Sequence, residues 1–333
     1  MTTIRDVAKA AGVTIATVSR ALNNEPGVNE LTRHKIASIA REMNYVPNMA
    51  AKRLANKKSN CIGIIWYNAQ GLFYSRWCND MQRRADLRGF STMISLAKPD
   101  QALRQFKEHF IDRIIYWCRP QSTPTLEFLQ ENQGFSGSVL IMGGNSVENT
   151  HRIGINRKDA LFKAVQHLAE LGHQRIAFVG QDAEKLAGFM QGLLEFQLFY
   201  HPDFIIHHNS PSPLPEASLS DLIHKGRQER PTAFVVDSHG MLFEFIRITK
   251  KHNISIPKHF ALIVYDSIPE MEQILDVPLT TVGPSIDRLS EAALDILTAE
   301  EPDSPDRKWI DITVEAELTI RESVLRPEEM MDI

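Results

Sequence analysis

Apolar residues in the first part of the chain recur with the period of short helices. In the stretch TIRDVAKAAG, residues 3 to 12, one helical face collects four apolar side chains: Ile4, Val7, Ala8 and Ala11. Thr3 can cap this helix with Asp6 as its capping-box partner, and Gly12 allows the tight turn that ends it. The pattern therefore predicts a first short helix that ends before Gly12.

A second and a third helix follow at once. Thr14 can cap the second helix, on which Val18 and Leu22 face the same core. The third runs from about Thr32 to Met43 and turns its apolar side chains inward: Ile36, Ile39, Ala40 and Met43. Two short helices joined by a turn that contains glycine, and braced by a third, are typical of a helix-turn-helix.

Four residues of the second helix lie off the face that Val18 and Leu22 bury, near the N-terminal end of the helix: Ile15, Ala16, Ser19 and Arg20. In a helix-turn-helix this end of the second helix enters the major groove, where arginine can contact guanine and apolar groups suit a thymine methyl. The candidate phosphate contacts are Thr14, Thr17, Asn23 and His34. The alternative to the helix-turn-helix is a plain amphipathic helix pair inside a bundle. The alternative for these four residues is a role as helix caps or as solvated surface.

The segment YVPNMAAKRLANKKS, residues 45 to 59, separates these helices from the rest of the chain. Pro47 ends the preceding structure, and Asn48 begins an alanine-rich helix too short to be stable alone. Leu54 stands on this basic segment, where an apolar side chain can wedge between base pairs in the minor groove. A flexible linker is the alternative interpretation.

From residue 61 onward the chain alternates between apolar runs typical of buried strands and amphipathic stretches typical of helices. A first series of strands is predicted at 61–66, 90–97, 112–117 and 138–143, and a second at 175–180, 232–237 and 261–266. This alternation predicts doubly wound α/β sheets, and two series predict two lobes with a cleft between them.

Charge is divided unevenly along the chain. Residues 1–59 hold ten Lys or Arg against four Asp or Glu, a charge of +6, and since the whole chain carries −4 the remainder carries −10. A basic head on an acidic body points to a polyanionic partner at the head. The chain has three cysteines without C-x-x-C spacing, Cys61, Cys78 and Cys118, which fits a reduced compartment. We also expect no signal peptide and no membrane span. Together these features indicate a cytoplasmic protein.

The motifs of common cofactor sites and hydrolases do not occur: G-x-G-x-x-G, the P-loop, H-E-x-x-H and G-x-S-x-G. The twelve histidines do not cluster with cysteine at zinc-like spacing. We therefore expect no enzyme activity, no cofactor and no metal. A periplasmic solute-binding protein and an α/β enzyme fused to a helical domain remain the rival classes.

Two stretches of the head resemble the LacI/GalR family of bacterial transcription regulators: TIRDVAKAAGVTIATVSRALNN at residues 3–24, and the pattern Y-x-P-N-x-x-A-x-x-L from Tyr45. The resemblance implies base-reading positions at Ile15, Ala16 and Arg20, and a hinge helix formed by Asn48, Ala51 and Leu54. The family has Ala-Arg where this chain has Ala51-Lys52-Arg53, which keeps the charge but not the fork of arginine at the first position.

The resemblance continues more weakly to the C-terminus, with HLAELGHQRIAFVG at 167–180 and LTIRES at 318–323. It implies a helix-turn-helix domain at 1–46, a hinge and linker at 47–59, and a type I periplasmic-binding-protein-like effector and dimerisation domain at 60–333. In that domain the chain crosses between the two lobes three times.

Ligands of such folds bind beyond the carboxyl ends of the strands. The candidate effector contacts are therefore Phe73, Tyr74, Lys185, Ser238, His239 and Asp266. The resemblance puts Lys185 where the family has a ligand-holding arginine, and Ser238-His239 where it has Asn-Asp, while Asp266 is unchanged. Lys185 and His239 could favour an anionic metabolite such as a sugar phosphate. The alternatives are a protein co-regulator in place of a small ligand, and a structural role for Asp266.

Taken together, these patterns predict a homodimeric DNA-binding repressor of carbohydrate-related genes. Its two heads would read a pseudo-palindromic operator, since dimer symmetry is mirrored in the site. A sugar or phosphorylated sugar bound between the lobes would control operator affinity.

Overall fold

The computed structural model describes residues 2–46, 59–67, 71–118, 122–207, 214–267, 277–299 and 308–332. The chain divides into two compact units. One is formed by Met1–Ser59 with Lys107–Ile111, and the other by Asn60–Phe106 with Asp112–Ile333.

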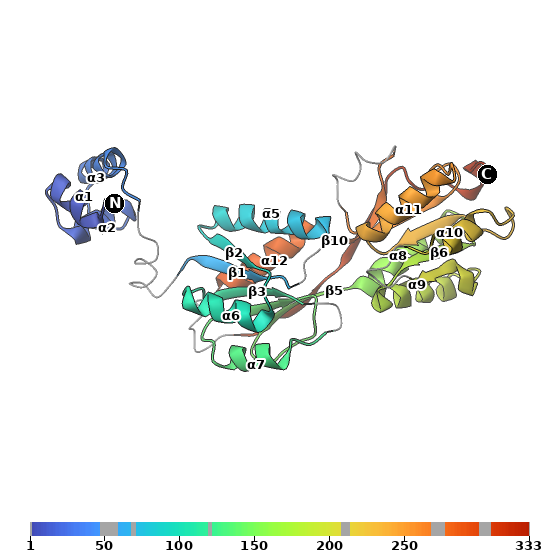
Figure 1. The fold of residues 1–333 in the computed structure, drawn as a ribbon, viewed down its shortest axis with the longest axis horizontal. Helices are drawn as coiled ribbons and strands as arrows, with labels where there is room; N and C mark the ends of the chain where they lie inside the picture. Colours follow the sequence, from blue (N-terminus) through green and yellow to red (C-terminus); the bar gives the residue numbers. More distant parts are fainter. Residues whose placement is uncertain are drawn as a thin grey trace. The chain divides into compact units, whose positions relative to one another are not determined.

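The head folds as the sequence predicts, into three helices that enclose a small apolar core (Figure 1): α1 Ile4–Ala11, α2 Ile15–Leu22 and α3 Glu30–Glu42. The carboxylate of Asp6 accepts hydrogen bonds from the backbone N–H and the hydroxyl of Thr3, at 2.8 and 2.7 Å, which fixes the start of α1. Gly12 ends α1 with φ +69°, a left-handed conformation that glycine adopts without strain. The core is made by Val7, Ala8, Ala11, Val18, Ala21, Ile36 and Ala40.

The first lobe of the body is built on a six-stranded sheet in the order β11-β5-β4-β3-β1-β2. Its strands are β1 Cys61–Ile65, β2 Ser91–Ser95, β3 Arg113–Trp117, β4 Ser138–Met142, β5 His151–Ile155 and β11 Asp311–Val314. Its helices are α5 Leu72–Leu87, α6 Pro99–Glu108, α7 Leu126–Gln133 and α12 Ile286–Ala299. All pairings in this sheet are parallel, so the central strands are buried on both faces.

The second lobe repeats this plan with the strand order β12-β10-β9-β8-β6-β7. Its strands are β6 Ile176–Gly180, β7 Ile205–His207, β8 Ala233–Val236, β9 Ala261–Tyr265, β10 Thr280–Pro284 and β12 Ala316–Thr319. Its helices are α8 Arg157–Glu170, α9 Ala183–Glu195, α10 Glu216–Ile223 and α11 His239–Lys251. Only β12 runs antiparallel to its neighbour, β10.

The chain passes between the two sheets at three points. It leaves the first sheet after β5, returns to it after β10 with α12 and β11, and re-enters the second sheet in β12. Figure 1 shows α12 beside α5 in the first lobe, although β10, which ends at Pro284 directly before α12, belongs to the second sheet. The lobes are therefore joined by short segments where an angular change between them can be absorbed.

All seven strands expected from apolar runs are present, within a residue or two at each end. Strands β5, β7, β10, β11 and β12 were not expected. The expected hinge helix, with Pro47, Asn48, Ala51 and Leu54, lies outside the described residues.

Candidate nucleic-acid interface and effector site

The start of α2 is fixed by its own threonines. The Thr14 hydroxyl accepts a hydrogen bond from the backbone N–H of Thr17 at 3.1 Å, and the two hydroxyls lie 2.9 Å apart. Thr14 is thus the cap that the sequence predicts, and its side chain serves the helix. Both hydroxyls remain on the surface, where a second partner can reach them.

Three predicted base-reading residues lie on the exposed side of α2. The side chain of Ile15 is 44% exposed, and Ala16 and Arg20 are exposed as well. Val18 and Ala21 on the opposite side are buried in the head core. Because an isoleucine at the first turn could have packed inward but does not, its exposure agrees with contact to a partner rather than with core packing.

The remaining predicted DNA contacts are less distinctive. Ser19 accepts a hydrogen bond from the Asn23 side chain at 3.4 Å, one turn along the helix. His34 is exposed on α3. These positions agree with phosphate contact and equally with solvated surface, so their role stays a prediction.

Arg33 is a head residue that the sequence reasoning did not single out. Its guanidinium donates to the Asn24 side chain at 2.9 Å and to the Glu25 carbonyl at 3.0 Å, and thereby braces the turn between α2 and α3. A Cβ on Gly27 of that turn would lie 3.7 Å from Arg20 Nη1. The braced turn therefore borders the guanidinium that we expect to read a base.

In the second lobe, Lys185 is buried at the first turn of α9. Its ammonium donates to the Asp237 carbonyl at 2.5 Å and lies 3.5 Å from the centroid of the Tyr265 ring. Only 7% of the residue is exposed. The ammonium that was expected to attract an anion is thus already held by a carbonyl and a ring face within the protein.

Asp237 follows β8 and is almost completely buried, at 1% exposure. Its Oδ2 accepts the backbone N–H groups of Gln181 and Asp182, at 2.8 and 3.0 Å. A Cβ on Gly180 would lie 2.3 Å from Asp237 Cγ, so only glycine lets this carboxylate approach the end of β6. Asp237 Oδ1 has no hydrogen-bond partner among the described residues.

Ser238 and His239 begin α11. Ser238 caps the helix, its hydroxyl accepting from the Met241 N–H at 3.4 Å. His239 is 6% exposed, and its Nε2 also has no partner among the described residues. Burial, and then the nearby charge of Lys185, lower the pKa of His239 to about 4, so the ring is neutral at pH 7.

Asp266 follows β9 in a left-handed conformation, φ +71°, with its N–H bonded to the Val282 carbonyl. Burial raises the pKa of its carboxyl to about 6 against the opposing effects of Lys185 and Arg157. The left-handed turn agrees with the structural alternative for Asp266, and its contact with an effector stays a prediction. Arg157 at the start of α8, which the sequence reasoning missed, also lies 3.6 Å from Glu184.

Phe73 and Tyr74 belong to an aromatic cluster in the first lobe. Trp66 and Trp117 stack with ring centroids 4.3 Å apart, Tyr74 meets Trp66 edge-on at 4.7 Å, and Phe73 meets Trp117 at 5.5 Å. Trp66 and Trp77 are buried, and Trp117 is half-buried. Phe73 also packs against the apolar core of the second lobe, so it contacts both lobes.

One glycine connects the aromatic cluster to the charged residues of the second lobe. A Cβ on Gly143 would lie 3.3 Å from Arg157 Nη2 and 3.9 Å from Trp117 Nε1. Lys185 therefore lies near His239 and Asp266 at the strand ends of the second lobe, and Arg157 connects this group to Trp117 of the first lobe.

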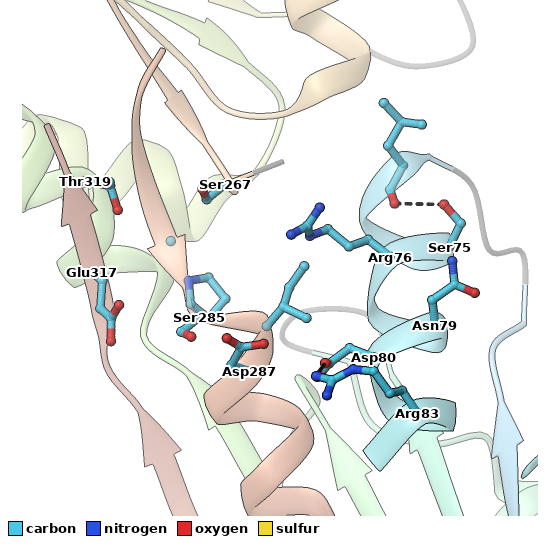
Figure 2. A pocket seen from close by; sticks show the side chains of 14 residues that line it. Ser75, Arg76, Asn79, Asp80, Arg83, Ser267, Ser285, Asp287, Glu317 and Thr319 are labelled. Carbon is cyan, nitrogen blue, oxygen red and sulfur yellow. Dashed lines mark hydrogen bonds and ion pairs between the residues drawn. The ribbon is translucent and has the colours of Figure 1, made fainter. Parts of the chain in front are cut away.

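A cavity of about 610 Å³ adjoins these residues, between α5 on one side and β10, the start of α12, and β12 on the other (Figure 2). Gly283 of its lining lies against Asp266, since a Cβ there would be 3.4 Å from Asp266 Oδ1. Arg76 extends from α5 into this space. Several of its charged groups are paired, Asp80 with Arg83 and Glu317 with Arg288. Its lining includes none of the predicted effector contacts. The candidate effector residues lie at the strand ends, where Asp237 Oδ1 and His239 Nε2 are buried polar atoms without partners among the described residues.

Within the described residues, no group of His, Cys, Asp and Glu could hold a metal ion, and no helix is both long and apolar enough to cross a membrane.

Two protein-family models match the chain. Residues 3–48 match the bacterial regulatory proteins of the lacI family, and residues 165–324 match the periplasmic binding protein-like domain. The chain belongs to the LacI family. The regulator is 24% identical to the HTH-type transcriptional repressor PurR of Aliivibrio fischeri strain MJ11, over 98% of this chain and 99% of that protein. It is 26% identical to catabolite control protein A of Priestia megaterium, over 89% and 91% of the two chains.

The regulator also shares its fold with a solved structure, the lac repressor dimer bound to operator and the anti-inducer ONPF. The TM-score is 0.76 with 20% identity, over 99% of each chain. The predicted fold class, helix-turn-helix helices followed by two α/β sheets of the type I periplasmic-binding-protein-like fold, is confirmed. So is the prediction of a DNA-binding transcriptional regulator.

Proposed function

We propose that this LacI-family regulator is a repressor that binds a pseudo-palindromic operator as a homodimer, acts in the cytoplasm and catalyses no reaction. Residues 1–46 would form the DNA-binding domain, 47–59 the hinge and 60–333 the effector and dimerisation domain. A small molecule at the strand ends between the lobes would change operator affinity by changing the angle between the lobes.

One observation carries the DNA-binding part of this proposal. Ile15, Ala16 and Arg20 form an exposed surface at the start of α2, in a helix pair whose opposite side is fully packed. A helix that enters the major groove needs this arrangement, with the reading side chains on its N-terminal end. The charge of +6 on residues 1–59 suits the phosphate backbone around it.

Replacement of Arg20 by alanine tests this assignment. We expect Arg20→Ala to weaken operator binding by ~1–3 kcal/mol and to relax base choice at one position in each half-site. Fluorescence anisotropy with a set of operators that differ by single base pairs measures both effects.

Arg41→Ala is the matched control, since Arg41 is an exposed head arginine whose Nε bonds the Ala37 carbonyl of its own helix. That variant should keep the base preference of the wild type. If Arg20→Ala kept it too, Arg20 would not be a base-reading residue.

Leu54 tests the proposed hinge. If Leu54 wedges between base pairs, Leu54→Ala weakens specific binding and leaves the salt-dependent non-specific affinity nearly unchanged. Titrations with operator and with unrelated duplex DNA of the same length separate the two terms. An equal loss of both would contradict the wedge.

A further inference from the structure

The strand-end site carries more acid than base. Around the Lys185 ammonium the structure gathers four carboxyl groups against two cationic side chains: Asp182, Glu184, Asp237 and Asp266 against Arg157 and Lys185. His239 adds no charge at pH 7, because its pKa is lowered to about 4. Only Asp237 of the four is buried, and the other three are half-buried. Because the carboxyl groups still outnumber the cationic side chains, the site disfavours an anion and attracts a cation.

The buried acceptors of this site lack donors. Asp237 Oδ1 has no partner among the described residues although Asp237 is 1% exposed, and His239 Nε2 has none although that residue is 6% exposed. A buried polar atom without a partner costs about 1–3 kcal/mol, so both atoms are stabilised by an incoming hydrogen-bond donor.

One ammonium group of the protein itself, that of Lys185, is already bound at this site. Lys185 Nζ is bound by a carbonyl oxygen and by the face of the Tyr265 ring. Trp117 and Phe73 are half-buried and meet with ring centroids 5.5 Å apart, and Trp117 lies against the same glycine as Arg157. Carboxylate oxygens beside aromatic rings are the surroundings that suit an organic ammonium ion.

We propose that the effector is a small cationic amine, which donates to Asp237 Oδ1 and His239 Nε2 while its apolar part packs against the aromatic cluster of the first lobe. This inference rests on the effector site of the proposed function, and it excludes an anionic effector such as a sugar phosphate. It assigns the contact with the amine chiefly to Asp237 Oδ1, which an anion held by Lys185 would leave without a hydrogen-bond donor.

Three probes of nearly the same size separate charge from shape: benzylamine, benzyl alcohol and benzoate. Each is titrated at millimolar concentration into the full-length wild-type protein, with binding followed by ligand-observed NMR and calorimetry. We expect benzylamine to bind at least about tenfold more tightly than either of the other two. Tighter binding of benzoate, equal binding of all three, or no binding of benzylamine would each overturn the proposal.

Two variants locate the preference. Asp237→Asn keeps an oxygen for the N–H groups of Gln181 and Asp182 and removes the negative charge. Asp266→Asn removes the second charge and suits the left-handed turn, because asparagine tolerates positive φ. We expect each variant to reduce the benzylamine preference by about tenfold. Asp221→Asn, an exposed position on α10, is the matched control and should leave the preference unchanged.

Failure of this proposal and failure of the proposed function are distinguishable. Operator binding by the same protein preparation, without any probe, reports on the head. If the wild type binds operator but shows no preference for benzylamine, only the proposal of an amine effector is refuted. If it does not bind operator, the proposed repressor function is refuted, and the ligand preference is unaffected.

Discussion

His173 shows how one buried residue can tie the stability of the second lobe to pH. The residue is completely buried after α8, with Nε2 2.9 Å from the Leu325 carbonyl and Nδ1 2.8 Å from the Thr232 hydroxyl. Because a carbonyl only accepts, Nε2 carries the proton and Nδ1 accepts. No sequence pattern indicates that the C-terminal segment covers this histidine.

Burial lowers the pKa of His173 to about 4, below the value of 6.5 that it has when exposed. The folded state therefore binds fewer protons than the unfolded state between these values, and stability falls as pH falls from 6.5 to 4. Both proteins are compared by the free energy of unfolding that they lose when the pH falls from 7 to 5. We expect this loss to be about 2 kcal/mol smaller for His173→Gln than for the wild type. The midpoints of urea unfolding at the two pH values measure this difference in stability.

An identical pH dependence in both proteins would show that His173 does not titrate in this range. His239 titrates in the same range, but it is present in both proteins and cancels in the comparison.

The residues of the candidate effector site were predictable only where they follow a predicted strand. Lys185 and His239 follow β6 and β8, whose apolar runs are plain in the sequence. Arg157 follows β5 by the same rule and was missed because β5 was not predicted. Which atoms lack partners depends on packing between segments far apart in the chain, and no sequence pattern carries that information.

At the scale of elements, most predicted strands are continuous apolar runs, although β2 is partly exposed. Runs such as CIGII and ALIVY are buried on both faces. In contrast β11 is largely exposed, and β10 reads TTVGP, with a glycine and a proline that weaken any strand signal. The missed strands β5, β10, β11 and β12 flank the points where the chain changes sheets, so the sequence predicted the two lobes better than their connection.

The close contact between α8 and α9 gives a prediction for one helix position. Gly188 of α9 lies against α8, and a Cβ there would be 2.0 Å from the Lys158 carbonyl oxygen. We expect Gly188→Ala to destabilise the second lobe by about 1–3 kcal/mol, since backbone must move to make room. Denaturant unfolding measures the loss.

Gly240→Ala is the control for this variant. Gly240 is also helical, on α11, and a Cβ there would meet nothing within 4 Å. Because alanine favours helix over glycine, that substitution should be neutral or stabilise by a few tenths of a kcal/mol. Equal effects of the two substitutions would mean that α8 and α9 can separate without cost.

At the scale of the whole molecule, the division of charge makes DNA binding strongly dependent on salt. The +6 of residues 1–59 faces phosphates, whereas the −10 of the remainder opposes contact of the body with DNA. We expect the affinity for unrelated duplex DNA to fall steeply and log-linearly with salt, as counterion release requires. Anisotropy titrations over a range of salt concentrations give the slope. A slope near zero would show that the head does not neutralise phosphates.

The two halves of the effector site also belong to different lobes, the acceptors Asp237 and His239 to one and the stacked tryptophans to the other. Binding of a ligand to this site and the change in operator affinity that follows it are therefore separable. A molecule short enough to reach only the acceptors would be a silent binder, with affinity but no efficacy, since it has nothing with which to draw the lobes together. A longer one that spans both would be an agonist, and the short one would compete with it. The length of a ligand, more than its affinity, would then decide whether the gene is switched.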